Sequence, residues 1–249
     1  MFPFRDHNPS ERTPIVTYAL IAMNCIIFLG YWSELDNNTA IYAFYDAWAM
    51  TPRDISAGLK WETFITSAFL HGGIWHLLGN MLFLYIYGDN LEDQMGPAWF
   101  LIFYLTCAIA AGMVQWLSAP YSQIPVIGAS GAVAGVMGGY LLLFPKAKVD
   151  VLFIFIIFFR IFSLPAWIIL GIWIALQFLN GFSTPADEAG VAYWAHIGGF
   201  VAGLLLCWPL FNRLGGRAYW QTHLGHPPHP DKVYTIARSR VPKIKRRRS

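Results

Sequence analysis

Two side chains that together can act as a nucleophile and a general base stand at the head of two glycine-rich apolar segments. Ser130 lies in GASGAVAGVMGG and His196 lies in AHIGGFVAG. An imidazole that accepts the proton of a serine hydroxyl converts that serine into a nucleophile for acyl groups. Ser130 also begins its predicted helix, where backbone N–H groups without helical partners can stabilise a developing oxyanion. The sequence therefore makes these two residues the first candidates for catalysis.

A second pair of polar residues lies in another apolar segment. His76 and Asn80 are four residues apart, so they share one helical face and could both donate hydrogen bonds to an oxyanion. Hydrogen bonds that hold the helices together are the alternative role for this pair. The polar or ionisable residues inside the predicted spans are few, and such residues are the default functional candidates in a membrane: Asn24, His71, His76, Asn80, Gln115, Ser130, Gln177, Asn180 and His196.

Other catalytic chemistries lack their motifs. The metalloprotease motif HExxH and the motif Gly-x-Gly-Asp are both absent, and we find no internal symmetry of the kind that transporters show. We therefore expect no metal and no cofactor. Asp187 and Glu188 precede His196 by eight to nine residues, but we expect them in an outer loop rather than as a third catalytic member.

The composition is that of a chain that crosses a membrane several times. Hydrophobic residues make up 56% of the 249 residues and charged residues only 12%, whereas a soluble domain carries about 25% charged residues. No Asp, Glu, Lys or Arg occurs between Gln94 and Pro145. One crossing takes roughly 20 apolar residues. A soluble globular protein, a disordered chain and a secreted disulfide scaffold are excluded.

The apolar segments predict an all-α polytopic membrane protein, a bundle of six transmembrane helices. The predicted spans are residues 14–32, 74–91, 97–118, 130–144, 165–182 and 192–211. The aromatic-rich first loop, about 34–65, is predicted to be an ordered insertion that lies on the membrane. Residues 149–164 are predicted to form a short hairpin or an interfacial loop, with Arg160 reaching the lipid phosphates. The predicted organisation is a cytoplasmic N-terminus (1–13), a helical domain (14–212) and a basic, disordered cytoplasmic tail (213–249).

The distribution of Lys and Arg predicts the orientation. With six spans, the two termini share one side with Lys146 and Lys148, whereas the other side holds only Arg53 and Lys60 apart from Arg160. The positive-inside rule then places both termini in the cytoplasm. The final VPKIKRRRS is predicted to be a solvated basic tail that touches anionic lipid, and we expect no nucleic-acid partner.

The depth of each candidate residue can be estimated from its distance to the charged end of its helix. Sixteen residues separate Ser130 from Lys146 and 17 separate His196 from Arg213, which corresponds to about 24 Å and about 25 Å of helix. His76 approaches the same level. Small residues form a stripe below each candidate (Gly131, Ala134, Gly135 and Gly138 below the serine, Gly199 and Gly203 below the histidine), and such faces let helix backbones approach closely. The two side chains are therefore predicted to meet, although ordinary tight packing is the alternative for the glycines alone.

Four motifs resemble the signature set of rhomboid intramembrane serine proteases. They are Gly128-Ala-Ser130-Gly131, Ala195-His196-x-x-Gly199-x-x-x-Gly203, His76-x-x-x-Asn80 and Gly88-x-x-x-Glu92-x-x-x-Gly96. The resemblance covers about residues 14–212, and the chain is similar to the compact six-helix bacterial form. Some members carry a tyrosine four residues after the serine, stacked on the histidine, and this chain has Ala134 there. Other groups must therefore orient the imidazole.

The resemblance implies a function and the roles of individual residues. It implies a Ser130–His196 dyad in a water-filled cavity, with oxyanion contacts from His76, Asn80 and the backbone N–H of Ser130. It implies a bacterial inner-membrane enzyme that cleaves single-pass membrane proteins near their outer ends, at small residues in helix-destabilised segments. Gly88, Glu92 and Gly96 are then a structural motif. The alternative is a non-catalytic member that binds membrane clients, and the sequence leaves the oligomeric state open.

Overall fold

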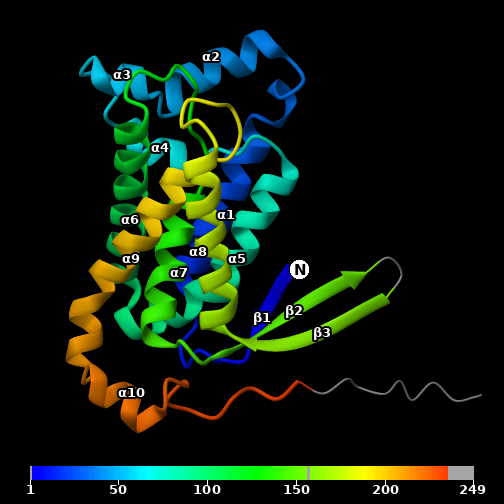
Figure 1. The fold of residues 1–249 in the computed structure, drawn as a ribbon. Helices are drawn as coiled ribbons and strands as arrows, with labels where there is room; N and C mark the ends of the chain where they lie inside the picture. Colours follow the sequence, from blue (N-terminus) through cyan, green and yellow to red (C-terminus); the bar gives the residue numbers. More distant parts are fainter. Residues whose placement is uncertain (1, 156–157, 235–249) are drawn as a thin grey trace, which may run out of the picture.

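The computed structural model describes residues 2–155 and 158–234 and is mostly helical. Six helices form the bundle, and their bounds agree with the predicted spans to within a few residues. They are α1 (Ile15–Gly30), α5 (Ile74–Met95), α6 (Pro97–Ser118), α7 (Ser130–Leu143), α8 (Ala166–Ser183) and α9 (Tyr193–Arg213). Figure 1 shows them running between a cap of short helices at one end and a small sheet at the other.

Length and composition identify fewer membrane spans than six. Within the described residues, α6, α8 and α9 are long and apolar enough to cross a bilayer. A fourth span arises if α5 is joined to the preceding segment Thr63–Phe69, from which it is bent by 99°. The helices α1 and α7 are apolar but shorter. The number of six crossings therefore stays a prediction.

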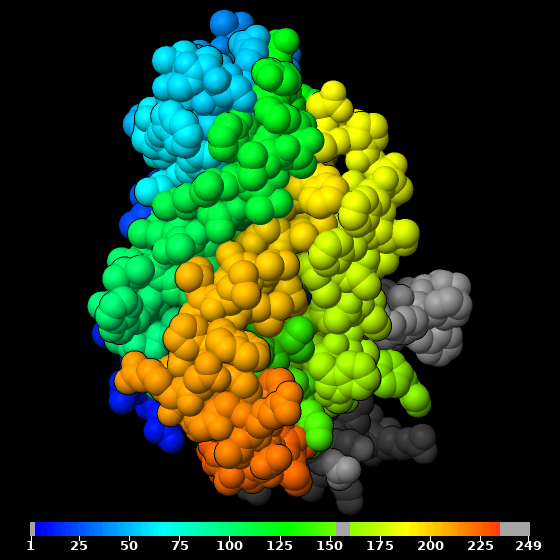
Figure 2. All heavy atoms as spheres, turned by 60° about the vertical axis from the view of Figure 1, so that its left-hand side comes forward, coloured from blue at the N-terminus to red at the C-terminus, as the bar shows by residue number. Residues whose placement is uncertain are grey.

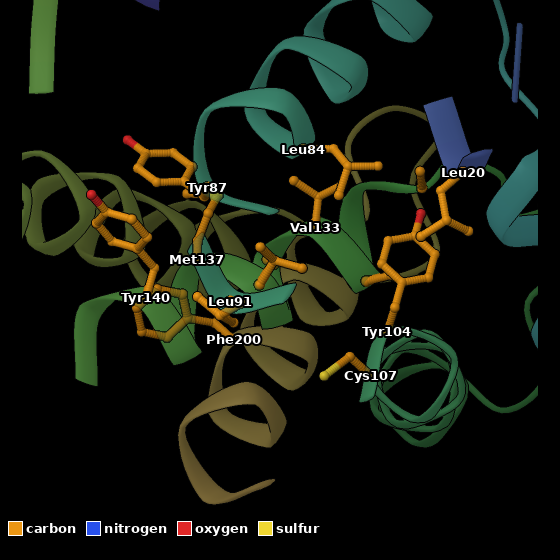
Figure 3. Packing of buried hydrophobic residues seen from close by; sticks show 14 of the residues in the cluster. Leu20, Leu84, Tyr87, Leu91, Tyr104, Cys107, Val133, Met137, Tyr140 and Phe200 are labelled. Atoms are coloured by element: carbon orange, nitrogen blue, oxygen red, sulfur yellow. The ribbon is translucent and has the colours of Figure 1, made fainter. Parts of the chain in front are cut away.

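The helix α7 lies in the middle of the bundle because nearly all of its side chains are small or apolar. It packs against α5, α6, α8 and α9, most closely against α9. Figure 3 shows side chains from several helices converging on it, among them Tyr87 of α5, Tyr104 of α6 and Phe200 of α9. On the outer surface α9 lies between α6 and α8 (Figure 2). A central helix of this kind holds its first residue, Ser130, in a fixed place.

Glycines let the backbones of α7 and α9 touch. A Cβ atom at Gly199 would overlap the carbonyl oxygen of Gly131, and one at Gly203 would overlap that of Gly135. These are the faces that the small-residue stripes predict. Gly198, one position along α9, instead faces the side chain of Val114 in α6, which a Cβ would meet at 2.5 Å.

The first loop is ordered and fastens the segment before α7. It contains α2 (Asn38–Trp48), α3 (Pro52–Ser56), α4 (Thr63–Thr66) and short 3-10 turns. Met50 and Val126 exchange backbone hydrogen bonds of 3.2 Å and 2.8 Å, and the N–H of Gly128 donates to the carbonyl of Ser67 at 2.9 Å. The predicted order of this insertion is confirmed, and its position on the membrane remains a prediction.

A three-stranded antiparallel sheet corrects the expectation of an all-α chain. The strands β2 (Lys148–Phe155) and β3 (Phe158–Pro165) form the hairpin predicted over 149–164, of which residues 156–157 lie outside the described residues. The N-terminal strand β1 (Phe2–Asp6) pairs with β2, and the order is β1-β2-β3. The segment predicted as a cytoplasmic N-terminus, residues 1–13, thus contributes β1 to the sheet.

The tail expected to be disordered from residue 213 contains a helix. This helix, α10 (Arg217–His223), packs Trp220 against Phe211 of α9 and donates the indole N–H of Trp220 to the carbonyl of Leu142 at 3.0 Å. The aromatic residues of this stretch supply the apolar surface that orders it. Residues 235–249, with the basic VPKIKRRRS, lie outside the described residues.

Candidate active site

Ser130 and His196 meet at the end of the bundle that carries the first loop. Ser130 is the first residue of α7, and His196 lies in the first turn of α9. The Oγ atom of Ser130 is 2.8 Å from Nε2 of His196. The depth estimate is therefore confirmed in the sense that the two side chains lie at one height and within hydrogen-bonding distance.

The other ring nitrogen of His196 contacts a residue to which the sequence assigned no role. Nδ1 is 2.8 Å from Oε1 of Gln177 on α8. One turn earlier on α8, the ring of Trp173 lies 5.6 Å from the imidazole, tilted by 36°. In some members of the family that the motifs resemble, a tyrosine four residues after the serine stacks on this imidazole. Here that position is Ala134, and Gln177 and Trp173 contact the ring instead. Gln177 was visible as one of the few polar residues in the apolar spans, whereas Trp173 gave no signal in so aromatic a chain.

His76 lies beside the serine. Its Nδ1 accepts a hydrogen bond from the backbone N–H of Gly72 at 3.3 Å, so the ring proton resides on Nε2. A Cβ atom at Gly128 would lie 2.7 Å from that Nε2 and 3.6 Å from Oγ of Ser130. Only glycine fits there, because its φ of +125° also lies in the region that other residues avoid. The close approach of Gly128 therefore leaves His76 room to point a donor toward the serine.

Asn80 lies one turn further along α5 and lines the same cavity as His76. Its Nδ2 donates to the carbonyl of His76 at 3.0 Å, which occupies one of its two amide hydrogens. The side chain is 7% exposed. The structure thus brings Asn80 to the site wall, with one amide hydrogen left for a further acceptor.

A cavity of about 810 Å³ opens over these residues. Several of the polar side chains of this mostly apolar bundle line the cavity: His76, Asn80, Gln115, Ser130 and His196. Gln115 of α6 accepts from the N–H of Ala195 at 3.1 Å and donates to the carbonyl of Ala186 at 3.3 Å. It thereby ties the loop before α9, and with it the helix turn that carries His196, to α6. The sequence marked Gln115 as polar and buried but could not show this link.

His71, another of the polar candidates from the sequence, is fully buried beside His76. The hydroxyl of Tyr31 accepts from the N–H of His71 at 2.6 Å and donates to its carbonyl at 2.8 Å. Neither ring nitrogen has a hydrogen-bond partner among the described residues, and the ring lies 5.0 Å from that of His76. Its backbone therefore fixes the turn that leads into α5.

The residues Gly88, Glu92 and Gly96 lie at the far end of the bundle. Glu92 is 3% exposed, and its carboxyl oxygens accept from the backbone N–H groups of Val16 and Thr17 at 2.9 and 2.8 Å and from the hydroxyl of Thr17 at 2.8 Å. These contacts satisfy the free N–H groups at the start of α1. Gly96, with φ of +78°, joins α5 to α6. The contacts of this motif join helix ends and do not reach the serine.

This arrangement of motifs and helices matches a known protein family. Residues 58–213 match the family model described as the rhomboid domain. The chain belongs to the rhomboid family. This rhomboid is an integral membrane protein of a family that includes serine proteases acting on membrane-protein substrates within the bilayer.

Three relatives of this rhomboid are named as mitochondrial, chloroplastic and bacterial proteins. It is 31% identical over 204 residues to "Rhomboid protein 1, mitochondrial" of Saccharomyces cerevisiae. The aligned region covers 78% of this chain and 52% of the yeast protein. It is 29% identical over 160 residues to "Rhomboid-like protein 11, chloroplastic" of Arabidopsis thaliana, covering 60% and 52% of the two chains. It is 30% identical over 128 residues to "Rhomboid protease GluP" of Bacillus subtilis, covering 51% and 24%. The chain thus spans about half the length of the first two relatives.

Proposed function

We propose that this rhomboid is an intramembrane serine endopeptidase in which Ser130 is the nucleophile and His196 the general base. The observation that carries the proposal is the 2.8 Å contact between Oγ of Ser130 and Nε2 of His196 at the wall of an 810 Å³ cavity. A serine and an imidazole at that distance form the minimal unit for nucleophilic attack on a peptide carbonyl. Membership of a family that includes proteases supports the same reaction.

The proposed reaction follows from the hydrogen bonds of the site. Oγ of Ser130 gives its proton to Nε2 of His196 and attacks the carbonyl carbon, and the carbonyl oxygen becomes an oxyanion. Its donors are the backbone N–H of Ser130 at the start of α7, Nε2–H of His76 and the free amide hydrogen of Asn80. His196 then protonates the leaving amine. A water molecule that gives a proton to His196 hydrolyses the acyl-serine and regenerates the enzyme.

We propose single-pass membrane proteins as substrates, cleaved near the outer membrane face in segments that leave the helical conformation. The cavity lies near the first-loop end of the bundle, so a substrate must present extended backbone there. For the membrane we propose a bacterial plasma membrane, with both termini and the sheet in the cytoplasm, six crossings and the first loop lying on the outer surface. The excess of Lys and Arg beside the sheet supports this orientation.

The orientation has its own test. A cysteine that replaces Glu188 should react in intact cells with a maleimide that cannot cross the membrane, whereas a cysteine that replaces Ser249 should not react. The three native cysteines lie in helices α1, α6 and α9, and their replacement by alanine gives the background for this test. The reverse labelling pattern would place the site on the cytoplasmic side.

The test of the function is cleavage of a single-pass membrane substrate by the detergent-solubilised protein. Ser130→Ala and His196→Ala should each abolish cleavage while the melting temperature stays near that of the wild type. Activity should persist in the presence of a chelator, since no metal enters the proposed reaction. Retained proteolysis in either variant would refute the dyad, and a folded wild type that binds but never cleaves any substrate would favour a client-binding role.

A further inference from the structure

The base of the proposed dyad is held by a neutral amide rather than by a carboxyl group. Nδ1 of His196 faces Oε1 of Gln177 at 2.8 Å, and Nε2 of Gln177 donates to the carbonyl of Trp173 at 3.2 Å. Gln177 is 8% exposed. The hydrogen bonds form a continuous series from the backbone of α8 through the amide and the imidazole to Oγ of Ser130. In this series, the donor and acceptor roles in one hydrogen bond determine those in the next.

The carbonyl of Trp173 fixes which way the amide points. A carbonyl oxygen only accepts hydrogen bonds, so the group that faces it must be the NH₂ of Gln177. In the flipped amide, two oxygens would face each other without a proton between them. The oxygen of Gln177 therefore faces Nδ1 of His196.

The amide in turn fixes the tautomer of the imidazole. Because Oε1 of Gln177 only accepts, Nδ1 of His196 must carry the proton of the neutral ring. Nε2 is then unprotonated and accepts from the hydroxyl of Ser130. This is the tautomer that a general base needs, and the opposite tautomer would direct a proton at the serine oxygen.

We propose that Gln177 is a positioning residue that holds His196 in the tautomer and orientation required for general-base catalysis. This inference rests on the proposed Ser130–His196 reaction and adds a third member that never touches the substrate. When Nε2 takes the proton of Ser130, Nδ1–H continues to donate to the amide oxygen, so the ring does not turn during the transfer. A neutral amide orients the ring with only a dipole to stabilise the imidazolium, unlike a carboxylate.

Among the described groups around His196, Gln177 is the one placed to accept the hydrogen bond from Nδ1. From α7 the imidazole faces Ser130, and from α8 it faces Gln177 and the ring of Trp173. From α5 the facing titratable group is His76, which lines the same cavity. At position 134, α7 has only the methyl group of an alanine, which cannot hold the ring. Among the described residues, no Asp or Glu is hydrogen-bonded to His196.

The experiment compares Gln177→Leu and Gln177→Glu with a matched control on the same helix. The control is Ser183→Ala. Both Ser183→Ala and Gln177→Leu remove a hydrogen bond from a side chain of α8 to the backbone carbonyl four residues earlier, that of Leu179 for Ser183 and that of Trp173 for Gln177. Ser183, however, is exposed and far less constrained by its surroundings than the buried Gln177. Cleavage of the single-pass substrate is measured from pH 5 to 9 with the melting temperature of each variant. Gln177→Leu should lower kcat about 10- to 100-fold with KM unchanged, because the ring loses its orientation. Ser183→Ala should match the wild type.

Gln177→Glu separates positioning from mere packing. One carboxylate oxygen restores an acceptor for Nδ1–H, but the other loses the hydrogen bond to the carbonyl of Trp173. The kcat at high pH should therefore lie above that of Gln177→Leu and below that of the wild type. The charge of the carboxylate also stabilises the imidazolium, which should move the acidic limb of the pH–rate profile upward by about one pH unit. A purely structural role predicts no such shift and no rescue by Glu.

The outcomes distinguish the two proposals. If Ser130→Ala still cleaves, the proposed function fails and the role of Gln177 falls with it. If Ser130→Ala is inactive but folded Gln177→Leu retains the kcat and pH profile of the wild type, only the role of Gln177 is overturned. If Gln177→Leu does not fold, Gln177→Glu decides: an acidic limb at the position of the wild type would contradict the inference.

Discussion

Two buried polar clusters lie at opposite ends of this bundle, and they differ in how completely their hydrogen bonds are satisfied. The inner cluster consists of Glu92 and Thr17, where a carboxyl group accepts three hydrogen bonds of 2.8–2.9 Å and does not line the 810 Å³ cavity. The outer cluster contains Ser130, His196 and His76 beside the 810 Å³ cavity. His76 lines that space, and its Nε2 has no hydrogen-bond partner among the described residues.

This difference fits a structural role for the buried polar groups around Glu92 and the proposed catalytic role for those around Ser130. A closed network rigidifies a fold because each group would be costly to leave unpaired. An open network keeps donors available for a charge that develops only during a reaction. Substitutions in the outer cluster should therefore change the rate at constant stability, and substitutions in the inner cluster should do the reverse.

The largest expected effect on this comparison comes from His76 and Asn80, the proposed side-chain donors to the oxyanion. His76→Ala and Asn80→Ala should each lower kcat by up to about 10²–10³-fold, because each removes one hydrogen bond to the transition state. The melting temperature should stay near that of the wild type. Steady-state cleavage kinetics with thermal unfolding in parallel is the measurement. A collapse in melting temperature with a normal kcat of the folded fraction would make the pair structural.

The contact between α7 and α9 is expected to have the next largest effect. A side chain at Gly199 overlaps the carbonyl of Gly131, the residue after Ser130, so Gly199→Val should displace Ser130 from His196. A displacement of about 1 Å can cost roughly 10²-fold in rate. The control is Gly171→Val on α8, where a Cβ atom has no neighbour within 4 Å. Equal activity in both variants would mean that this helix contact does not set the geometry of the site.

Glu92→Gln tests the inner cluster. The new NH₂ group faces N–H donors at the start of α1, and a buried donor left unpaired costs about 1–3 kcal/mol. The free energy of unfolding should fall by that amount, while the kcat of the folded protein stays unchanged. Asp93→Asn is the matched control, because within the described part of the chain Asp93 accepts a single, exposed hydrogen bond, from the N–H of Glu11 at 3.2 Å. A loss of kcat without a loss of stability would remove the contrast between the clusters.

The smallest effect concerns Asp6, which belongs to the sheet at the same end as Glu92. Burial, and then the charge of Asp89, raises the pKa of Asp6 to about 8, and the hydroxyl of Tyr140 donates to its carboxyl group at 2.8 Å. Because the folded state binds this proton more tightly than the unfolded state, the contribution of Asp6 to stability is greatest below about pH 4. It declines as the pH rises to about 8.

Asp6→Asn removes this titration. Its melting temperature should fall less between pH 5 and pH 8.5 than that of the wild type, by a few degrees. Ionisable groups that do not interact with Asp6 contribute equally to both proteins, so the difference between the two curves reports Asp6 together with Asp89, the charge that acts on it. Parallel curves would show that Asp6 does not hold its proton in the folded protein.

The sequence predicted much of the outer cluster because helix length converts directly into depth. Ser130 and His196 could be placed at one height from the charged ends of their helices alone. The link from His196 to Gln177 could not be predicted, because it depends on how α8 rotates against α9. For the same reason the sequence could not show that Gly198 faces the side chain of Val114 of α6.

Long-range pairing explains the other differences. The strand β1 pairs with a strand about 145 residues later, and its five residues show no signal strong enough to predict that pairing. The hairpin of β2 and β3 was predictable because it is local. The seven-residue helix α10 follows two glycines and depends on tertiary packing against α9, which a prediction from composition cannot see.

The most direct measurement of the central claim is labelling of the solubilised protein by a fluorophosphonate probe, which reacts with activated serine nucleophiles. The wild type should be labelled at Ser130, Ser130→Ala should not be labelled, and folded His196→Ala should be labelled far more slowly. Equal labelling of Ser130→Ala and the wild type, or no labelling of a folded wild type, would contradict the account.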